Sequence, residues 1–292
     1  MGAAIDALET AFRDEEPSSA PLRSRVDTPS GSLLSMPAGG TRGVGVKLVT
    51  LTDANPSRGL PFVQAVYVMF DAETQAPTAV LDGDALTALR TAAVSGLATR
   101  HLARPDARRL VVFGAGVQAA AHLEAMAAVR PVDEVVVVSR TRGRAEALAA
   151  CAEEKGIRAS VGGPQAVAHA DLVCTCTTSP MPVFDGAMLT AGSHVNAVGA
   201  YLPDTREVDT ETVRRARVVV ETREVAAAEA GDVLVPIAEG AVRAEHVVAD
   251  LCELARGTPV RRSPEDVTLF VSVGMAFEDL VVAGAVAEAL GS

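Results

Sequence analysis

The fold is decided by residues 107–141, which read ARRLVVFGAGVQAAAHLEAMAAVRPVDEVVVVSRT. The short apolar run Leu110–Phe113 has the composition of a strand that is buried on both faces. A glycine turn, Gly114 to Gly116, follows at once, and the Ala-rich stretch to about Val129 fits a helix. Val135–Val138 reads as a second buried strand. Strand, glycine turn, helix and strand form a βαβ unit, which is the arrangement that binds dinucleotides.

Each small residue of this turn has a physical role. Gly114 permits the tight turn out of the strand, and Gly116 lets the backbone approach a pyrophosphate. Ala119 stands where a third glycine often stands, and it is small enough for the helix to pack on the strand. The helix start, at Val117 and Gln118, then turns its free N–H groups toward an anion. An ordinary strand-to-helix turn would also explain the glycines alone, but the flanking strands favour a cofactor site.

The end of the second strand indicates which cofactor binds. A site for NAD usually carries Asp or Glu there, to hold the ribose 2′-hydroxyl. This chain has Ser139, Arg140, Thr141 and Arg142 instead, so no carboxylate repels a 2′-phosphate and Arg140 can pair with one through its planar guanidinium. The alternative is that Arg140 and Arg142 are solvated loop charges. We expect the first three residues to bind the cofactor, which we predict to be NADPH, with NADH possible.

The composition limits the partners of this chain. It has 292 residues, 49% of them hydrophobic, which is enough for one large or two modest domains. Its formal net charge of −11 argues against nucleic acid and anionic membranes, and the absence of Trp argues against a platform for base stacking. The longest apolar stretch, Leu269–Leu290, is interrupted by Glu278 and Asp279, so we expect no membrane span. Four cysteines match no zinc pattern and follow no recognisable secretory signal, so we expect no metal site and a reduced, cytoplasmic setting.

The rest of the chain divides into an antiparallel and a parallel part. Val44–Leu51, Val63–Phe70 and Thr78–Leu81 read as strands of a mostly antiparallel sheet. From Ala85 to Leu102 the apolar residues recur at helical spacing, and the βαβ unit follows. Two later strands, one ending near Thr175 and Thr177 and the other near Val198, place residues at the edge where doubly wound sheets bind ligands. A loop before Pro180 would explain the hydroxyl residues at the end of the first strand equally well. From these strand ends we predict cofactor contacts by Thr175, Thr177 and Val198.

Together, six stretches resemble the ornithine cyclodeaminase/mu-crystallin family, and the resemblance covers nearly the whole chain. The stretches are residues 47–49 (KLV), 86–93 (LTALRTAA), 114–119 (GAGVQA), 196–200 (NAVGA), 231–234 (GDVL) and 272–279 (SVGMAFED).

This resemblance implies an α/β protein in which a Rossmann doubly wound parallel sheet is inserted into a smaller α+β substrate and dimerisation domain. It places residues 1–90 and 276–292 in the substrate domain and residues 91–275 in the dinucleotide-binding domain. It further implies a homodimer whose substrate lies in a cleft between the domains.

The resemblance also implies which residues act on a substrate. Arg25 would grip the substrate carboxylate, although Arg23 is close enough to leave the alternative open. Lys47 would lie near the reacting carbon and Arg90 would bind the substrate. Taken singly, Lys47 could be an exposed charge on an edge strand and Arg90 a surface residue of its helix. We add Gln64 to the predicted substrate contacts, and Thr91 and Ser272 to the predicted cofactor contacts.

One departure from the family pattern separates two activities. Cyclodeaminases carry an Asp shortly after the NAVG motif, where this chain has Tyr201, and nearby Asp204 also occurs in reductases that resemble mu-crystallin. We therefore predict an NAD(P)H-dependent reductase of a cyclic ketimine carboxylate, a small anionic imino acid, with Lys47 as the catalytic residue. The alternatives are an ornithine cyclodeaminase, an enzyme like alanine dehydrogenase, and a non-catalytic NADPH-binding protein.

Overall fold

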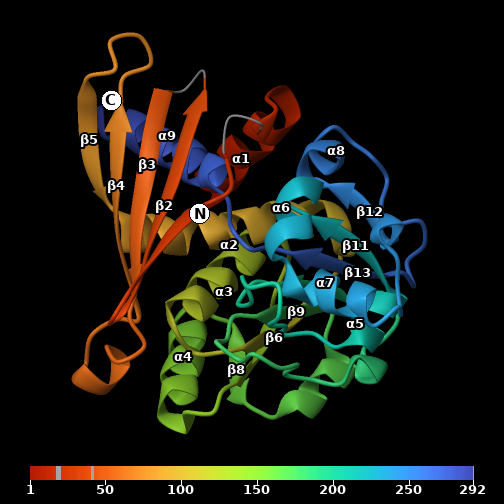
Figure 1. Cartoon of the computed structure of the whole chain (residues 1–292). Coiled ribbons are helices and arrows are strands. Elements are labelled where there is room, and N and C mark those ends of the chain that lie inside the picture. The colour runs from red at the N-terminus through yellow and green to blue at the C-terminus, as the bar shows by residue number, and fades with distance from the viewer. Residues whose placement is uncertain (18–20, 41–42, 292) are drawn as a thin grey trace. The chain divides into compact units, whose positions relative to one another are not determined.

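In a computed structural model, the described residues 1–17, 21–40 and 43–291 fall into two compact units (Figure 1). The parallel-sheet unit contains residues 1–2 and 91–273, and the antiparallel-sheet unit contains residues 3–90 and 274–292. The predicted domains divide the chain after residues 90 and 275. The roles that the prediction assigns to the two domains stay predictions.

The parallel-sheet unit is a doubly wound sheet of eight strands, in the order β12-β11-β13-β10-β9-β6-β7-β8. All of its strand pairs are parallel. The chain first runs outward from β6 through β7 to β8 and then returns to β9 on the other side of β6, which creates a switch point where such sheets bind ligands. The strands are β6 Arg109–Phe113, β7 Glu134–Val138, β8 Arg158–Val161, β9 Leu172–Thr175, β10 His194–Ala197, β11 Ala216–Val220, β12 Val247–Asp250 and β13 Val267–Val271.

Helices pack against this sheet through small apolar side chains. Helix α3 buries Ala119, which has no exposed surface, together with Leu123 and Met126. This close contact is what the small residue at position 119 was predicted to allow. The helices of the unit are α3 Val117–Val129, α4 Arg142–Glu154, α5 Thr210–Arg215, α6 Arg223–Glu229, α7 Gly231–Ala238 and α8 Leu251–Ala255, with 3₁₀ turns η3 Pro164–His169, η4 Gly186–Met188 and η5 Ala244–His246.

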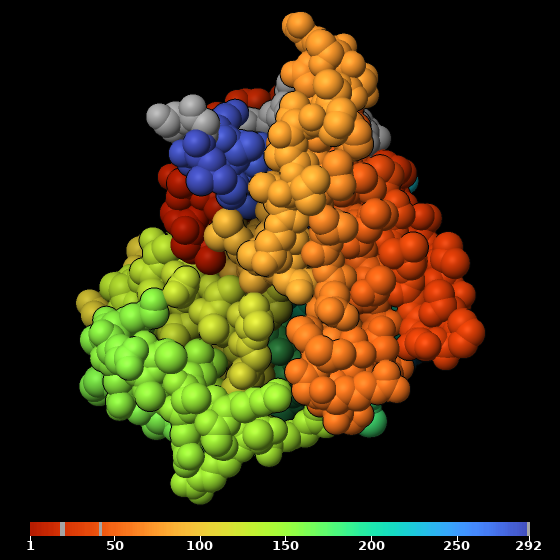
Figure 2. Space-filling view, turned by 90° about the vertical axis from the view of Figure 1, so that its left-hand side faces the viewer, coloured from red at the N-terminus to blue at the C-terminus, as the bar shows by residue number. Residues whose placement is uncertain are grey.

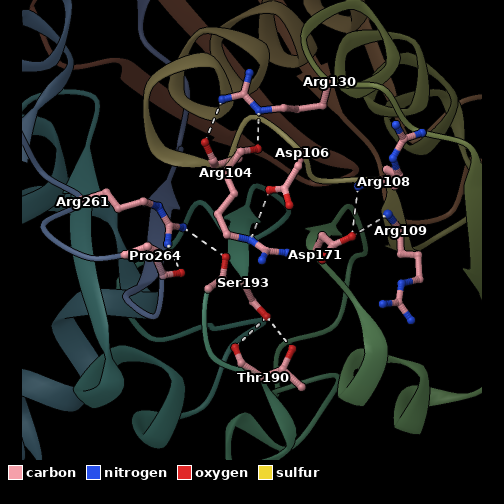
Figure 3. Close-up of polar contacts among 12 residues, drawn as sticks. Arg104, Asp106, Arg108, Arg109, Arg130, Asp171, Thr190, Ser193, Arg261 and Pro264 are labelled. Atoms are coloured by element: carbon pink, nitrogen blue, oxygen red, sulfur yellow. Dashed lines mark hydrogen bonds and ion pairs between the residues drawn. The ribbon is translucent and has the colours of Figure 1, made fainter.

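Arginines close the amino-terminal edge of the parallel sheet (Figure 3). Arg130 donates to the carbonyl oxygens of Thr99 and Arg100, in the last turn of helix α2 (Gly83–Leu102), and to that of Ala103, which directly follows the helix. Arg104 pairs with Asp171 at 2.6 Å, and the Asp171 carboxylate also accepts the backbone N–H groups of residues 108 and 109. Guanidinium groups thus satisfy carbonyl groups that a helix end leaves without a partner.

The antiparallel-sheet unit has five strands in the order β1-β2-β3-β4-β5. Its antiparallel sheet, together with the parallel sheet of the other unit, confirms the predicted fold class. Helix α9 packs on β2 and β3, and Phe277 of α9 meets Phe12 of α1 with ring centroids 5.2 Å apart. Along β3 every second residue, from position 43 to position 51, is buried. The elements are α1 Gly2–Asp14, β1 Ser24–Thr28, β2 Gly31–Gly40, β3 Gly43–Leu51, η2 Pro56–Arg58, β4 Val63–Phe70, β5 Pro77–Asp82 and α9 Ala276–Gly291.

The other face of this sheet exposes apolar side chains. Leu33, Leu48, Val66 and Val80 are 36% to 70% exposed. The orange residues of this unit lie at the surface on the side seen in Figure 2. In the described ranges, no helix is long and apolar enough to cross a membrane.

Candidate functional site

A cleft of about 650 Å³ opens at the carboxyl ends of β6, β7, β8 and β9. Its lining begins with the last residues of β6 and β7 and with the first residues after β8 and β9, at the switch point of the sheet. Six of the predicted cofactor residues line it: Gly114, Gly116, Ser139, Arg140, Thr141 and Thr177.

The glycine turn is shaped for a group that approaches the backbone closely. Gly114 has φ = +105°, and a Cβ there would lie 2.4 Å from the carbonyl oxygen of Cys176. A Cβ at Gly116 would meet no atom within 4 Å, so this edge of the cleft is open space. No side chain caps α3, which begins after Gly116. The turn therefore suits a pyrophosphate, because backbone N–H groups at a helix start bind anions.

The end of the cleft beside β7 is cationic. Arg140 and Arg144 line it, and no lining residue carries a carboxylate. Thr141 is the N-cap of α4 but makes no capping bond with its side chain. Arg142, by contrast, points to Glu146 at 2.8 Å and does not line the cleft. Arg144 was not predicted. Its position two residues after Arg142, in a helix that starts beside the cleft, could have indicated it.

The other predicted cofactor residues do not line this cleft. Ser272 is buried and donates to Glu221 at 2.7 Å, so its hydroxyl is occupied within the protein. Val117 is 70% exposed at the start of α3. The remaining residues, Thr91, Gln118, Thr175 and Val198, are also absent from the lining.

Two buried carboxylates support the strand ends around the cleft. Glu207 accepts the N–H groups of Thr177 and Gly199, at 2.7 Å and 2.6 Å. Asp232 lies behind it and accepts the N–H groups of Glu207 and Val208. Burial raises the pKa of the Glu207 carboxyl, and burial raises the pKa of Asp232 to about 7. Within the described residues neither carboxylate has an ion pair, so backbone N–H groups carry most of their stabilisation.

A second group of buried charges lies in the antiparallel-sheet unit. The Lys47 ammonium is 2.8 Å from the carboxylate of Asp279, and these side chains are 1% and 0% exposed. Arg90 reaches Glu278 at 2.8 Å through Nη1 and Asp279 at 3.0 Å through Nε. We call these four residues the charged cluster. Removing one partner from such a buried set leaves an uncompensated charge, which is costly.

Local structure explains how the charged cluster forms. Lys47 is one of the alternate residues of β3 that face α9, and α9 begins with Glu278 and Asp279 in its first turn. Gly274, two residues before this helix begins, has φ = +79°, and a Cβ there would lie 2.4 Å from the Arg90 guanidinium. The glycine thus makes room for the arginine.

The charged cluster perturbs the proton affinity of Lys47. Burial, followed by the charges of Arg90 and Arg23, lowers its pKa, while Asp279 raises it, with a result of about 8. A lysine with this pKa can donate a proton near neutral pH, as a general acid must.

Arg23, and not Arg25, lies near Lys47. Arg23 donates to the carbonyl oxygen of Gly274 at 2.6 Å, and its charge acts on Lys47. Arg25 lies on β1, whose residues are all exposed, and pairs with Asp27 at 2.7 Å beside a separate polar hollow. The structure thus brings Arg23, and not the preferred Arg25, close to Lys47, while Arg25 pairs with Asp27. Substrate binding by either arginine stays a prediction.

Gln64 also lies outside the charged cluster. It pairs in register with Thr50, whereas Lys47 pairs with Tyr67. Because side chains alternate along a strand, Gln64 and Tyr67 project from opposite faces of β4. Gln64 is exposed and Tyr67 is fully buried. Gln64 therefore lies on the opposite face of the sheet from Lys47, and its contact with substrate stays a prediction.

No role was predicted for Glu278 and Asp279, although both lie in one of the six stretches that resemble the family. Their signal was present, because these two acidic residues stand among apolar residues in the first half of α9, where residues 276–284 are all buried. A buried acid needs a partner, and Lys47 and Arg90 were already candidates. Tyr67, whose hydroxyl lies beside Gly45, gave no comparable signal.

Comparisons with known proteins agree with this geometry. The profile of the ornithine cyclodeaminase/mu-crystallin family matches residues 1–292. A Δ1-pyrroline-2-carboxylate reductase of Bacillus cereus is 38% identical over 251 residues, which are 84% of this chain and 77% of that protein. The solved structure of the Thermococcus litoralis Δ1-pyrroline-2-carboxylate reductase, in complex with NADH and L-proline, has a TM-score of 0.93 and 34% identity, over 99% of this chain and 93% of that one. An archaeal alanine dehydrogenase dimer with bound NAD also has a TM-score of 0.93 and 34% identity, over 99% and 91%.

Proposed function

The chain belongs to the ornithine cyclodeaminase/mu-crystallin family, and from this premise we propose that it is an NAD(P)H-dependent oxidoreductase that reduces the C=N bond of a cyclic ketimine carboxylate. The substrate would be Δ1-pyrroline-2-carboxylate or Δ1-piperideine-2-carboxylate, and the product L-proline or L-pipecolate. The observation that carries the proposal is the buried Lys47, held beside Arg90 and within the electrostatic influence of Arg23. Relatives that are reductases and dehydrogenases agree with the prediction of an oxidoreductase.

The residues of the charged cluster fit an anionic imine. Arg90 and Arg23 would bind the carboxylate, since guanidinium groups match carboxylate geometry. Lys47 would give its proton to the imine nitrogen while the imine carbon gains a hydride, so that C=N becomes CH–NH. Lys47 then takes a proton from solvent. A nicotinamide dinucleotide supplies the hydride when it is bound.

For the cofactor we propose a preference for NADPH. Arg140 and Arg144 line the end of the cleft beside β7, where a carboxylate that would oppose a 2′-phosphate is absent. The two solved structures above contain NADH and NAD, so a bound nicotinamide dinucleotide is what these two relatives share. The arginines are the reason to expect the phosphorylated form here.

The experiment that tests the activity compares two reactions. NADPH consumption with each cyclic ketimine carboxylate is measured beside ammonia release from ornithine with NAD. We expect reduction and little ammonia, because Tyr201 stands where cyclodeaminases carry an Asp. Ammonia release by the wild type would favour a cyclodeaminase, and Tyr201→Asp tests whether one residue separates the two.

Two other outcomes bear on the alternatives. Alanine formation from pyruvate and ammonia would favour an enzyme like alanine dehydrogenase, for which the archaeal structure is the supporting observation. Tight NADPH binding without turnover of any of these substrates would favour a binding protein.

We also propose a homodimer that covers the exposed face of the antiparallel sheet. Leu48 and Val66 are paired in register on that face, and both are more than a third exposed. Exposed apolar patches of this kind mark contact surfaces. Light scattering should show a dimer for the wild type and a monomer for a Leu48→Glu, Val66→Lys double variant.

A further inference from the structure

One short segment contacts each of the three cations that the proposed function assigns to the substrate. The carbonyl oxygen of Gly274 accepts from Arg23 at 2.6 Å, and Glu278 pairs with Arg90 at 2.8 Å. Asp279 contacts both Lys47 and Arg90, at 2.8 Å and 3.0 Å. Residues 274–279 therefore anchor cations that come from three distant parts of the chain.

We propose that Asp279 is a positioning residue for proton transfer: it orients the Lys47 ammonium, keeps it charged and ties it to Arg90, so that Lys47 delivers its proton to the substrate nitrogen. The proposal rests on the proposed function and adds a residue that acts through Lys47.

The geometry leaves Lys47 able to serve a ligand. An ammonium group has three N–H donors, and the Asp279 carboxylate is its one hydrogen-bonding partner among the described residues. Both carboxylate oxygens lie 2.8 Å from the nitrogen, so they fix the ammonium from one side. The remaining donors of a buried ammonium need an acceptor, and a substrate nitrogen or carboxylate provides one.

The groups around Lys47 make Asp279 the main group that favours the charged form of the lysine. From the neighbouring elements, Arg90 on α2, Arg23 before β1, Tyr67 on β4 and Asp279 on α9 act on the ammonium or lie beside it. Tyr67 is neutral, because burial raises the pKa of its hydroxyl. Glu278 pairs with Arg90, so Asp279 is the carboxylate that offsets burial and two guanidinium groups at Lys47.

The chain offers an unusually direct test, because Lys47 and Lys155 are its only lysines. Protein labelled with ¹³C at the lysine ε-carbon gives two signals, whose titration NMR follows without substrate or cofactor. Lys155 is exposed and paired with Glu124, which raises its pKa, so it serves as the internal reference. We expect Lys47 to titrate near pH 8 in the wild type and at least one pH unit lower in Asp279→Asn.

The matched control is Glu278→Gln, which removes the neighbouring carboxylate but keeps Asp279. We expect this variant to raise KM for the ketimine and to leave the Lys47 midpoint within about half a pH unit of the wild type, because its contact is with Arg90. If both variants shift Lys47 equally, Asp279 has no special role and the proposal is overturned.

Activity provides the second readout. In Asp279→Asn the alkaline limb of the kcat profile should move to lower pH with the Lys47 midpoint, and kcat at pH 8 should fall at least about tenfold. The Kd for NADPH should not change. If the alkaline limb of the kcat profile or the midpoint of the Lys47 NMR titration does not move in Asp279→Asn, the role of Asp279 is merely structural.

Asp279→Glu keeps the charge on a longer side chain and guards against a variant that does not fold. It should hold the Lys47 midpoint near that of the wild type while kcat falls about tenfold, since the ammonium is displaced. An unchanged kcat would contradict positioning. If the wild type reduces no ketimine, the proposed function fails, whereas the NMR titration still decides whether Asp279 controls Lys47.

Discussion

Each unit of this protein buries two neighbouring carboxylates, and it satisfies them in opposite ways. In the parallel-sheet unit, Glu207 and Asp232 accept backbone N–H groups and hold the strand ends of the cleft. In the antiparallel-sheet unit, Glu278 and Asp279 face full positive charges.

This difference in partners indicates a structural role for the first pair of carboxylates and a chemical role for the second. A carboxylate bound by backbone N–H groups fixes loops and gains nothing from a substrate. A carboxylate bound to an ammonium and a guanidinium controls groups that can themselves bind and donate. In this protein the acid pair with side-chain cations as partners is the one that belongs to the proposed reactive site.

Lys47→Met has the largest expected effect, and it should change ketimine reduction without changing NADPH binding in the parallel-sheet unit. Ketimine reduction should fall about 10²- to 10⁴-fold, as for the loss of a general acid. NADPH affinity, measured by fluorescence titration, should stay at the wild-type value, because Lys47 does not line the cleft. Lys155→Met is the control and should change neither quantity. A comparable loss of NADPH affinity would mean that the two sites are not separable.

Asp232→Asn tests the backbone-bound pair through the pH dependence of stability. The pKa of Asp232 is raised to about 7 in the folded protein, while an unfolded Asp titrates near 3.9. The folded state therefore binds the proton more tightly, and the wild type loses stability as pH rises from about 4 to about 7.

The free energy of unfolding from denaturant titrations should show this loss relative to Asp232→Asn, by at most about 4 kcal/mol across that window. Equal pH profiles for the two proteins would contradict the raised pKa.

Arg23→Ala and Arg25→Ala form a matched pair in the antiparallel-sheet unit. Loss of a charged hydrogen bond to the carboxylate should raise KM for the ketimine about 10- to 100-fold in Arg23→Ala. Arg25→Ala should leave it within about twofold, since Arg25 pairs with Asp27 instead. Steady-state kinetics decide between them, and the reverse result would restore the first assignment.

Arg140→Ala and Arg142→Ala make the corresponding pair beside the cleft, with the smallest expected effect. Arg140→Ala should weaken NADPH binding by about 1.5–3 kcal/mol and hardly affect NADH. Arg142→Ala should affect neither, because Arg142 pairs with Glu146 outside the cleft. Calorimetry with both nucleotides measures this, and equal losses for NADPH and NADH would exclude a 2′-phosphate contact.

The cleft was more predictable from the sequence than the charged cluster, for a physical reason. The glycine turn and Arg140 belong to one local βαβ pattern, in which spacing in sequence sets spacing in space. Lys47 and Asp279 are 232 residues apart, and their contact depends on how α9 packs on β3. No local period encodes that contact.

Arg25 and Gln64 show a second limit. Their assignments depended on the exact residue within a strand or beside it, and a shift of one position moves a side chain to the other face. Arg23 and Arg25 differ by two positions, but β1 is exposed at every residue and gives no alternation to read. When buried and exposed residues do not alternate along a strand, the sequence can predict the strand but not which of its side chains contact the site.

The arginine-closed end of α2 has a consequence for motion. Helix ends normally fray, because their last carbonyl groups exchange partners with water. Here Arg130 occupies the carbonyl groups of Thr99, Arg100 and Ala103 at once. Amide hydrogens in the last turn of α2 should therefore exchange with deuterium only through large-scale opening, and Arg130→Lys should release them. Arg90 lies on this same helix, whose carboxyl end Arg130 holds.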